Sequence, residues 1–403
     1  MLKGKTLYIP SIALDSAELL ASAFRACGLN SAAMPPSDER TRDFRDRHTS
    51  GDECHPFQIL AGDVMKLLES GAADPARSVF FLPASSGACR FNRFVPDLRV
   101  ILDDAGYAEA GIFSPNPHVA EDLIALGEGV LRTARRALIA GGNARKLLLI
   151  HRPFELEKGA ADKLYGAAIQ ELCAMIESAP LDPLDQFTKI SSTLLGIRES
   201  FLALPLKEER SAPVIGIVGE LFCRLNPLLN NDLIRQLEER GGQARLIGLA
   251  EELRSFVGAL PGATEKLNLD EKGFNELFQN DFAGWGDPDS GDLLDDAKSY
   301  LPIEDGFAPI ARRLGQIMHM AKQGVDCVLD VSPFPCMYGS ACAAFYPKLR
   351  RDLDSLPIIE MYLQGTKQDW SWLLDDALEQ ARTYRSRKEK EQTHNTSAIS
   401  NRL

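Results

Sequence analysis

Hydrophobic residues at the start of the chain form short continuous runs that alternate with segments of helical spacing. Residues 5–12 are a short apolar run, and residues 17–27 repeat apolar positions at helical spacing until Gly28 ends the pattern. The same order recurs in a predicted strand over 78–83, a helix over 95–105 that Gly106 closes, and a strand over 110–114. Strands that alternate with helices are typical of a parallel sheet covered by helices. We therefore expect an N-terminal α/β domain over residues 1–117.

The middle of the chain follows a different pattern, because apolar residues over 118–205 lie mostly at helical spacing. Segments 164–176 and 187–204 are the clearest examples, and Pro153, Pro180 and Pro183 interrupt the pattern. This region predicts a helical connector between two domains.

Strand and helix patterns alternate again after the connector. Residues 213–219 predict a buried strand, and a helical segment over 232–240 ends at two glycines. The remaining predicted elements are a helix over 308–323, a strand over 325–331, a helical stretch over 340–353 that Pro347 interrupts, a strand over 356–363 and a final helix from about residue 370. We expect a C-terminal α/β domain over 206–385. Residues 386–403 contain almost nothing apolar, which predicts a disordered tail.

Composition narrows the possible functions. The 403 residues are 45% hydrophobic, which is enough for the cores of two or three domains. The formal net charge of −12 disfavours a broad phosphate-binding surface, so nucleic acid is not an expected partner. The sequence has no apolar segment typical of a membrane span or secretory signal, and we expect a protein of the cytoplasm. Its eight irregularly spaced cysteines indicate reduced thiols rather than a disulfide framework.

Three of the cysteines stand where a turn precedes a predicted helix. Cys54 precedes His55 and Pro56, while Cys89 and Cys336 follow predicted strands, at the edge where parallel sheets place binding loops. Helix N-termini favour a thiolate, and soft thiolates bind iron–sulfur clusters, zinc or Cu(I). The residues alone leave these metals open, together with the alternative that the three are ordinary buried cysteines.

Longer phrases around these cysteines resemble the 2-hydroxyacyl-CoA dehydratase and activator-associated family. The resemblance is to its stand-alone relatives, labelled as predicted activators of 2-hydroxyglutaryl-CoA dehydratase and grouped with benzoyl-CoA-reductase-type proteins. It covers residues 5–385 and is carried by Tyr8-Ile9-Pro10, Thr49-Ser50-Gly51-Asp52-Glu53-Cys54, Cys89-Arg90-Phe91, Val218-Gly219-Glu220-Leu221-Phe222, Arg224-Leu225-Asn226-Pro227, Val331-Ser332-Pro333-Phe334 and Cys336-Met337.

The resemblance implies tandem Rossmann-like or flavodoxin-like domains that bind an oxygen-sensitive iron–sulfur cluster, expected to be [4Fe–4S]. The matching ligand positions in this sequence are Cys54, Cys89 and Cys336. An acyl-CoA substrate and a homodimeric or heteromeric assembly are further implications of the resemblance. The sequence departs from the family pattern at Asn92-Arg93, at the shifted Gly339 and at Leu363-Gln364-Gly365, so loop shapes near the cluster can differ.

ATP hydrolysis is not expected of this chain, because the sequence contains no GxxxxGK[ST] phosphate loop. We therefore expect the cluster to receive low-potential electrons from a separate ATP-dependent activator. The alternative is a non-catalytic scaffold or delivery protein that holds zinc or a cluster.

Polar residues near the cysteines are candidates for catalysis or substrate contact. His55, Arg90 and Glu220 are the leading candidates: His55 to gate protons, Arg90 to stabilise an anionic cluster, and Glu220 to accept a proton. Further candidates are Glu53, Arg224, Asn226 and Ser332. Cys342 is a candidate extra ligand, although core packing is the favoured interpretation, and the cysteines interpreted as structural are Cys27, Cys173, Cys223 and Cys327.

Overall fold

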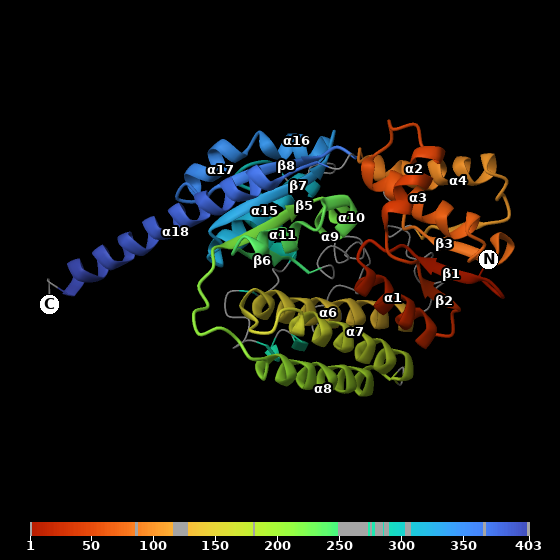
Figure 1. Ribbon diagram of the computed structural model, residues 1–403, viewed down its shortest axis with the longest axis horizontal. Helices are drawn as coiled ribbons and strands as arrows, with labels where there is room; N and C mark the ends of the chain where they lie inside the picture. The colour runs from red at the N-terminus through yellow and green to blue at the C-terminus, as the bar shows by residue number, and fades with distance from the viewer. Residues whose placement is uncertain are drawn as a thin grey trace.

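The computed structural model describes residues 2–84, 88–115, 128–179, 182–248, 273–274, 276–278, 285, 290–302, 308–365 and 368–400. Two four-stranded parallel sheets, each flanked by helices, form the two halves of the molecule (Figure 1). The predicted α/β class with tandem Rossmann-like domains is thus confirmed. Among the described helices, none combines the length and apolar character needed to cross a membrane.

The N-terminal sheet has the strand order β2-β1-β3-β4. Its strands are β1 (Thr6–Ile9), β2 (Ser31–Ala33), β3 (Ser78–Phe81) and β4 (Gly111–Phe113). Strand β1 pairs with β2 on one side and β3 on the other. The helices of this half are α1 (Leu14–Ala26), α2 (Glu39–His48), α3 (His55–Glu69) and α4 (Phe94–Asp104), with short 3-10 turns at Pro75–Arg77 (η1) and Arg90–Arg93 (η2).

The C-terminal sheet repeats this topology with the order β6-β5-β7-β8. Its strands are β5 (Val214–Gly219), β6 (Gln243–Leu246), β7 (Cys327–Pro333) and β8 (Ile358–Leu363). Its helices are α9 (Leu221–Leu225), α10 (Pro227–Asn230), α11 (Leu233–Glu239), α14 (Ser290–Ala297), α15 (Ala308–Lys322), α16 (Met337–Ala343), α17 (Tyr346–Asp352) and α18 (Ser371–Ser400). All seven residues of β7 are buried, including the polar Asp330 and Ser332, so both faces of this strand are covered.

Three long helices lie beneath both sheets (Figure 1): α6 (Glu128–His151), α7 (Ala160–Ser178) and α8 (Pro183–Leu202), with the short η3 (Arg152–Phe154) after α6. They occupy the region predicted as a connector. Their apolar faces share one core cluster with Leu7 and Ile9 of β1, so they are integral to the N-terminal half rather than a separate linker. At the other end of α6, Leu149 belongs to the C-terminal core, and Arg152 pairs with Glu238.

The C-terminal tail departs from the expectation of disorder, since α18 continues to Ser400 as one helix. Tyr384 is the last buried residue of this helix among those described, and Figure 1 shows the remainder projecting away from the body. Charged pairs four residues apart, such as Arg385 with Glu389 and Arg387 with Glu391, support helical structure without apolar contacts.

In both sheets the strand order reverses at the equivalent position, between the first and third strands of that half. In each half the chain moves from the first strand to one neighbour and then crosses to the other side, which makes β1/β3 and β5/β7 the switch points. Ligands of parallel α/β proteins bind outside the carboxyl ends of strands at such points. The loops that follow β3, β5 and β7 are therefore the places to look for a site.

Candidate metal centre

Cys54 is the N-cap of α3, as the sequence predicts. The turn before it is held by the Glu53 carboxylate, which accepts hydrogen bonds from the backbone N–H groups of Ser50 at 2.9 Å and Gly51 at 3.0 Å. Burial acts to raise the pKa of Glu53, but these hydrogen bonds outweigh it and lower the pKa overall. Glu53 therefore shapes the turn that presents Cys54, and its oxygens are committed to that turn.

Cys89 lies in the loop that follows β3, at the N-cap of η2. Its Sγ accepts a hydrogen bond from the backbone N–H of Phe91 at 3.5 Å. The neighbouring Arg90 donates from Nη2 to the backbone carbonyl of Asp52. Arg90 thus joins the Cys89 turn to the Cys54 turn, and its charge acts to lower the pKa of the Cys54 thiol. From the sequence we expect Arg90 to stabilise Cys89, its neighbour in the chain. In the structure Arg90 bonds to the turn before Cys54 and its charge acts on the pKa of Cys54.

Cys336 comes from the other half of the molecule, after β7. It is the N-cap of α16, and its Sγ accepts a hydrogen bond from the backbone N–H of Gly339 at 3.4 Å. Gly339 packs against Ser332, and an added Cβ would lie 2.8 Å from Ser332 Oγ. Arg313 Nη1 donates to the same hydroxyl at 2.9 Å. Ser332 therefore supports the Cys336 turn from below.

Arg313 was not singled out from the sequence, yet it is a buried cation beneath this turn. Its guanidinium forms an ion pair with Asp330 at 3.2 Å, and the Tyr346 hydroxyl donates to the same carboxylate. Burial opposes the charge of Arg313, but Asp330 and the nearby thiols, Cys336 among them, raise its pKa overall. The sequence shows only that Arg313 lies in a helical pattern, on α15. That pattern does not indicate that the residue lies near a site.

Glu220 follows β5 and lies at the same edge of the sheet as Cys336. Its backbone N–H donates to Val331 O at 2.9 Å, and its carboxylate accepts from the backbone N–H of Cys223 at 2.9 Å as the N-cap of α9. The preceding Gly219 has φ +118°, and an added Cβ would lie 2.0 Å from Val331 O. The close approach of β7 therefore requires glycine at this position, and the backbone of Gly219 sets the position of Glu220.

The pKa shifts of the thiols indicate that these separate turns lie near one another. The pKa of the Cys54 thiol is raised first by burial and then by the charges of Glu220, Cys89 and Cys336. Burial likewise raises the pKa of Cys89, with further contributions from Cys336 and Glu220. The three predicted ligands and Glu220 are therefore neighbours. Helix N-termini are present as expected, but burial outweighs their effect on Cys54 and Cys89.

Cys223, interpreted from the sequence as a structural residue, lies beside this group. It is fully buried, and its pKa is raised by burial, by Glu220, and by Cys54 and Cys336. Cys342 is also fully buried and interacts with Arg313, while burial raises its pKa to about 12. Its Sγ lies 4.0 Å from the carbonyl of Ile310, a contact with the core behind α16.

His55 is buried at the start of α3. Burial lowers its pKa to about 4, so the ring is neutral at pH 7. Its Nδ1 lies 3.4 Å from Gln58 Oε1, and an added Cβ on Gly365 would lie 3.2 Å from the same nitrogen. His55 is therefore enclosed between its own helix and the loop after β8.

The two remaining polar candidates, Arg224 and Asn226, both lie in the C-terminal half of the molecule. Asn226 is 1% exposed and donates to Ser11 O at 3.2 Å and Ser37 Oγ at 2.9 Å, so it bridges the halves. Arg224 is fully buried on α9. The remaining thiols lie elsewhere: Cys27 and Cys173 pack against the core around α6, and Cys327 is in the C-terminal core.

The donor set fits a polynuclear metal group. All eight cysteines are free thiols. Within the described ranges, no three side chains of His, Cys, Asp or Glu are grouped so that they could hold one metal ion. In an iron–sulfur cluster each cysteine binds a different iron, so the sulfurs need not converge on a single point. Cys54, Cys89 and Cys336 have the thiol chemistry that such a cluster requires.

A pocket of about 210 Å³ opens beside Cys54. The aromatic rings of Phe57 and Phe94 and the guanidinium groups of Arg90 and Arg93 are among its walls. A larger cleft of about 610 Å³ lies at the amino end of β8, between α17 and α18, away from the cysteines. The smaller pocket is therefore the one that borders a candidate ligand, Cys54.

The fold and the site together define a class of protein: two parallel α/β domains with three cysteines and a carboxylate near one another in loops from both domains. No protein-family model matches the chain, and no curated protein matches it.

Proposed function

We propose that this protein holds an iron–sulfur cluster, of the [4Fe–4S] type, between its two α/β domains. Cys54, Cys89 and Cys336 would be the protein ligands. One observation carries the proposal: Cys54, Cys89 and Cys336, drawn from both domains, each stand at the N-cap of a helix or 3-10 turn, and the charges of Cys89 and Cys336 both raise the pKa of Cys54.

The function that this site supports best is that of a redox component of the 2-hydroxyacyl-CoA dehydratase type. It would accept low-potential electrons from a separate ATP-dependent activator, and serve reduction or dehydration of an acyl-CoA or another small molecule. A bound cluster supplies one-electron transfer at low potential. Reduced thiols and such a cluster are suited to the cytoplasm, which is where we place the protein.

The residues around the cysteines have distinct roles in this proposal. Arg90 holds the Cys89 turn against the Cys54 turn, and Arg313 provides a buried positive charge that offsets the negative charge of thiolates. Glu220, whose carboxylate accepts from the Cys223 backbone N–H, would exchange a proton with a bound molecule. The pocket beside Cys54 offers an approach to the site for part of a small molecule.

Metal and sulfide analysis of anaerobically purified protein tests this proposal. We expect iron with an equal amount of acid-labile sulfide, and loss of both in Cys54→Ala, Cys89→Ala and Cys336→Ala. Cys27→Ala is the matched control, because Cys27 is a half-buried thiol that packs against the core around α6. Zinc without sulfide would favour the scaffold alternative, and absence of metal from every sample would refute a metal centre.

A protein that passes this test can then be assayed for function. The purified holoprotein should be reduced by an ATP-dependent activator and by dithionite, with loss of visible absorbance, while the Cys336→Ala variant should not respond. An activator that reduces the Cys336→Ala variant equally well would contradict the assignment of the electron-accepting site.

A further inference from the structure

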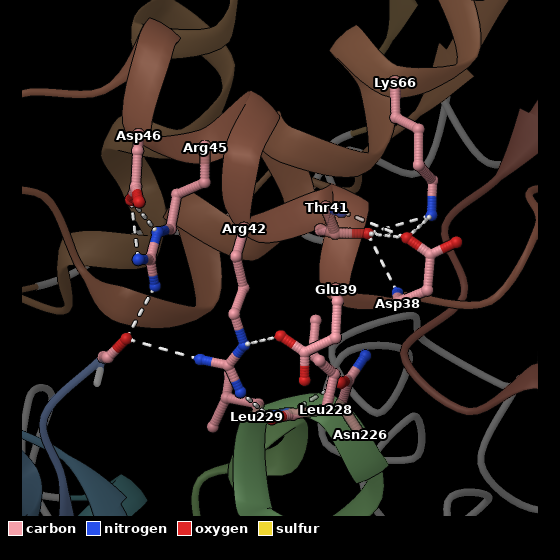
Figure 2. A network of polar contacts seen from close by, with 11 residues as sticks. Asp38, Glu39, Thr41, Arg42, Arg45, Asp46, Lys66, Asn226, Leu228 and Leu229 are labelled. Atoms are coloured by element: carbon pink, nitrogen blue, oxygen red, sulfur yellow. Dashed lines mark hydrogen bonds and ion pairs between the residues drawn. The ribbon is translucent and has the colours of Figure 1, made fainter. Parts of the chain in front are cut away.

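A second group of contacts joins the two domains next to the cysteines. Figure 2 shows Arg42 and Arg45 of α2 reaching across the interface from the N-terminal domain. Arg45 Nη1 donates to the backbone carbonyl of Gly365 at 2.7 Å, and Arg42 Nη1 lies 3.5 Å from the same oxygen. Arg42 Nη2 donates to Leu228 O at 2.8 Å. Two guanidinium groups therefore hold the loop after β8 and the helix α10.

The two arginines are fixed from their own side of the interface. Arg42 Nε pairs with Glu39 at 3.3 Å, and Arg45 Nη2 pairs with Asp46 at 2.6 Å. Their side chains are only 16% and 12% exposed. Side chains that are already ordered lose little conformational entropy when they form a contact, so these groups are prepared to bind the facing carbonyls.

Asn226 forms the matching contact from the C-terminal domain. Its Nδ2 donates to Ser11 O after β1 and to Ser37 Oγ before α2, while its Oδ1 caps α10 by accepting from Leu229 N–H at 3.1 Å. Ser37 in turn donates to the buried Asp63 at 2.5 Å. Every hydrogen-bonding atom of this amide thus has a partner, and the contact extends into the N-terminal core.

Gly365, whose carbonyl faces Arg42 and Arg45, lies close to the helix that carries Cys54. Gly365 has φ +74°, and an added Cβ would approach the His55 ring to 3.2 Å. His55 is the first residue of α3, whose N-cap is Cys54. The position of the loop after β8, set by Arg42 and Arg45, is therefore coupled to the start of α3.

We propose that Arg42, Arg45 and Asn226 form an interdomain joint that keeps the two domains docked in the absence of any bound metal. The joint holds Cys336 in register with Cys54 and Cys89, so that the ligand set exists before a cluster is inserted. These are positioning residues. Their contacts are present in the chain itself, whereas the importance of the register for a cluster rests on the proposed function.

Thiol crosslinking of the metal-free protein tests the joint. Dibromobimane bridges two nearby thiols, and peptide mapping identifies which cysteines are joined. In the parent protein we expect bridges from Cys336 to Cys54 or Cys89. In the double variant Arg42→Met/Arg45→Met, which keeps an unbranched side chain at both positions, the yield of these bridges should fall about tenfold as Cys336 loses its register with Cys54 and Cys89.

Two controls separate loss of register from loss of folding. The Cys54–Cys89 bridge lies within the N-terminal domain and should form equally in both proteins. Arg47→Met is the matched variant, because Arg47 lies on the same helix and pairs with Glu69 within its own domain. Its Cys336 bridges should match those of the parent protein.

The variant Asn226→Asp provides a second, independent perturbation. It preserves the oxygen that caps α10 and removes the donor to Ser11 and Ser37. We expect a lower yield of the Cys336 bridges in this variant as well. If the double arginine variant does not fold, this result alone tests the joint. Unchanged bridging by Cys336 in both Asn226→Asp and a folded double arginine variant would overturn the joint.

Failure of the joint and failure of the proposed function are distinguishable, because the crosslinking uses no iron. Crosslinks that depend on the arginines in a chain that never binds iron would support the joint and refute the cluster. A chain that binds iron and sulfide but crosslinks independently of the arginines and Asn226 would retain its proposed function without the joint.

Discussion

Replacement of Gly219 by alanine should disturb the backbone next to Glu220. Gly219 is the last residue of β5, has φ +118° and precedes Glu220. An alanine Cβ would lie 2.0 Å from Val331 O and 2.7 Å from Val331 N on the neighbouring strand β7. Both contacts are with backbone atoms, which cannot move without disturbing the pairing of β5 with β7.

The expected cost of Gly219→Ala has two parts. Positive φ costs a residue with a Cβ about 1–2 kcal/mol, and forcing a methyl group into packed structure costs about 1–3 kcal/mol. We therefore expect the free energy of unfolding to fall by about 2–5 kcal/mol. Gly324→Ala isolates the first part, because Gly324 has φ +84° in the same domain but no atom within 4 Å of an added Cβ. That control should cost about 1–2 kcal/mol.

Urea unfolding followed by tryptophan fluorescence measures the difference. Trp370 packs against the C-terminal core and Trp285 against the cores of both halves, so the signal includes unfolding of the C-terminal domain. Hydrogen exchange supplies a local readout, since the Glu220 amide bonded to Val331 O should lose protection in Gly219→Ala. If both alanine variants lower stability equally, within about 0.5 kcal/mol, the reasoning about β7 is wrong.

Three further substitutions test buried contacts. In Asp15, burial acts to raise the pKa but the Arg145 ion pair lowers it overall, so its stabilisation is present above pH 3.8 and is lost as pH falls below that value. Asp15→Asn should cost about 3 kcal/mol at pH 7, and urea titrations should show the difference shrinking below pH 4; a pH-independent difference would refute this. Ile59→Ala should cost about 2–5 kcal/mol in urea unfolding, because fully buried Ile59 on α3 belongs to the C-terminal core cluster, and a loss under about 0.5 kcal/mol would contradict that packing. Asp330→Asn should cost about 3 kcal/mol in the same assay by leaving buried Arg313 without its counter-charge, whereas an unchanged midpoint would show that the pair is dispensable.

Much of the fold could be predicted because its central strands are buried on both faces. The run that forms β5 is continuous and apolar, and β7 is mostly apolar although it contains Asp330 and Ser332, so both strands could be predicted from the sequence. Strand β2 was missed because Ser31–Ala33 is short and composed of small residues. Helix α2 was missed because it buries only Thr41 and Phe44 and has no apolar period, although Asp38 and Thr41 form a capping box that marks its start.

The site was only partly visible for a different reason. Cys54, Cys89 and Cys336 stand at helix N-termini, and that local signal could be found in the sequence. Cys223 and Arg313 lie in ordinary helical patterns, and they reach the site only through tertiary packing. Burial of the thiols, which opposes the effect of the helix N-termini on the pKa of Cys54 and Cys89, is likewise a property of the assembled domains.

The two halves of the molecule use equivalent positions for different purposes. Cys89 and Cys336 both follow the third strand of a sheet with the same strand order, so each half contributes one thiol from the same topological place. The loops after the first strands differ: the C-terminal one presents Glu220 to the thiols, whereas the N-terminal one offers the Ser11 carbonyl to Asn226. The loop after β5 therefore contributes a carboxylate beside the thiols, whereas the loop after β1 contributes a hydrogen bond between the halves. The three cysteines come from both halves, so their arrangement depends on a defined interface between the domains.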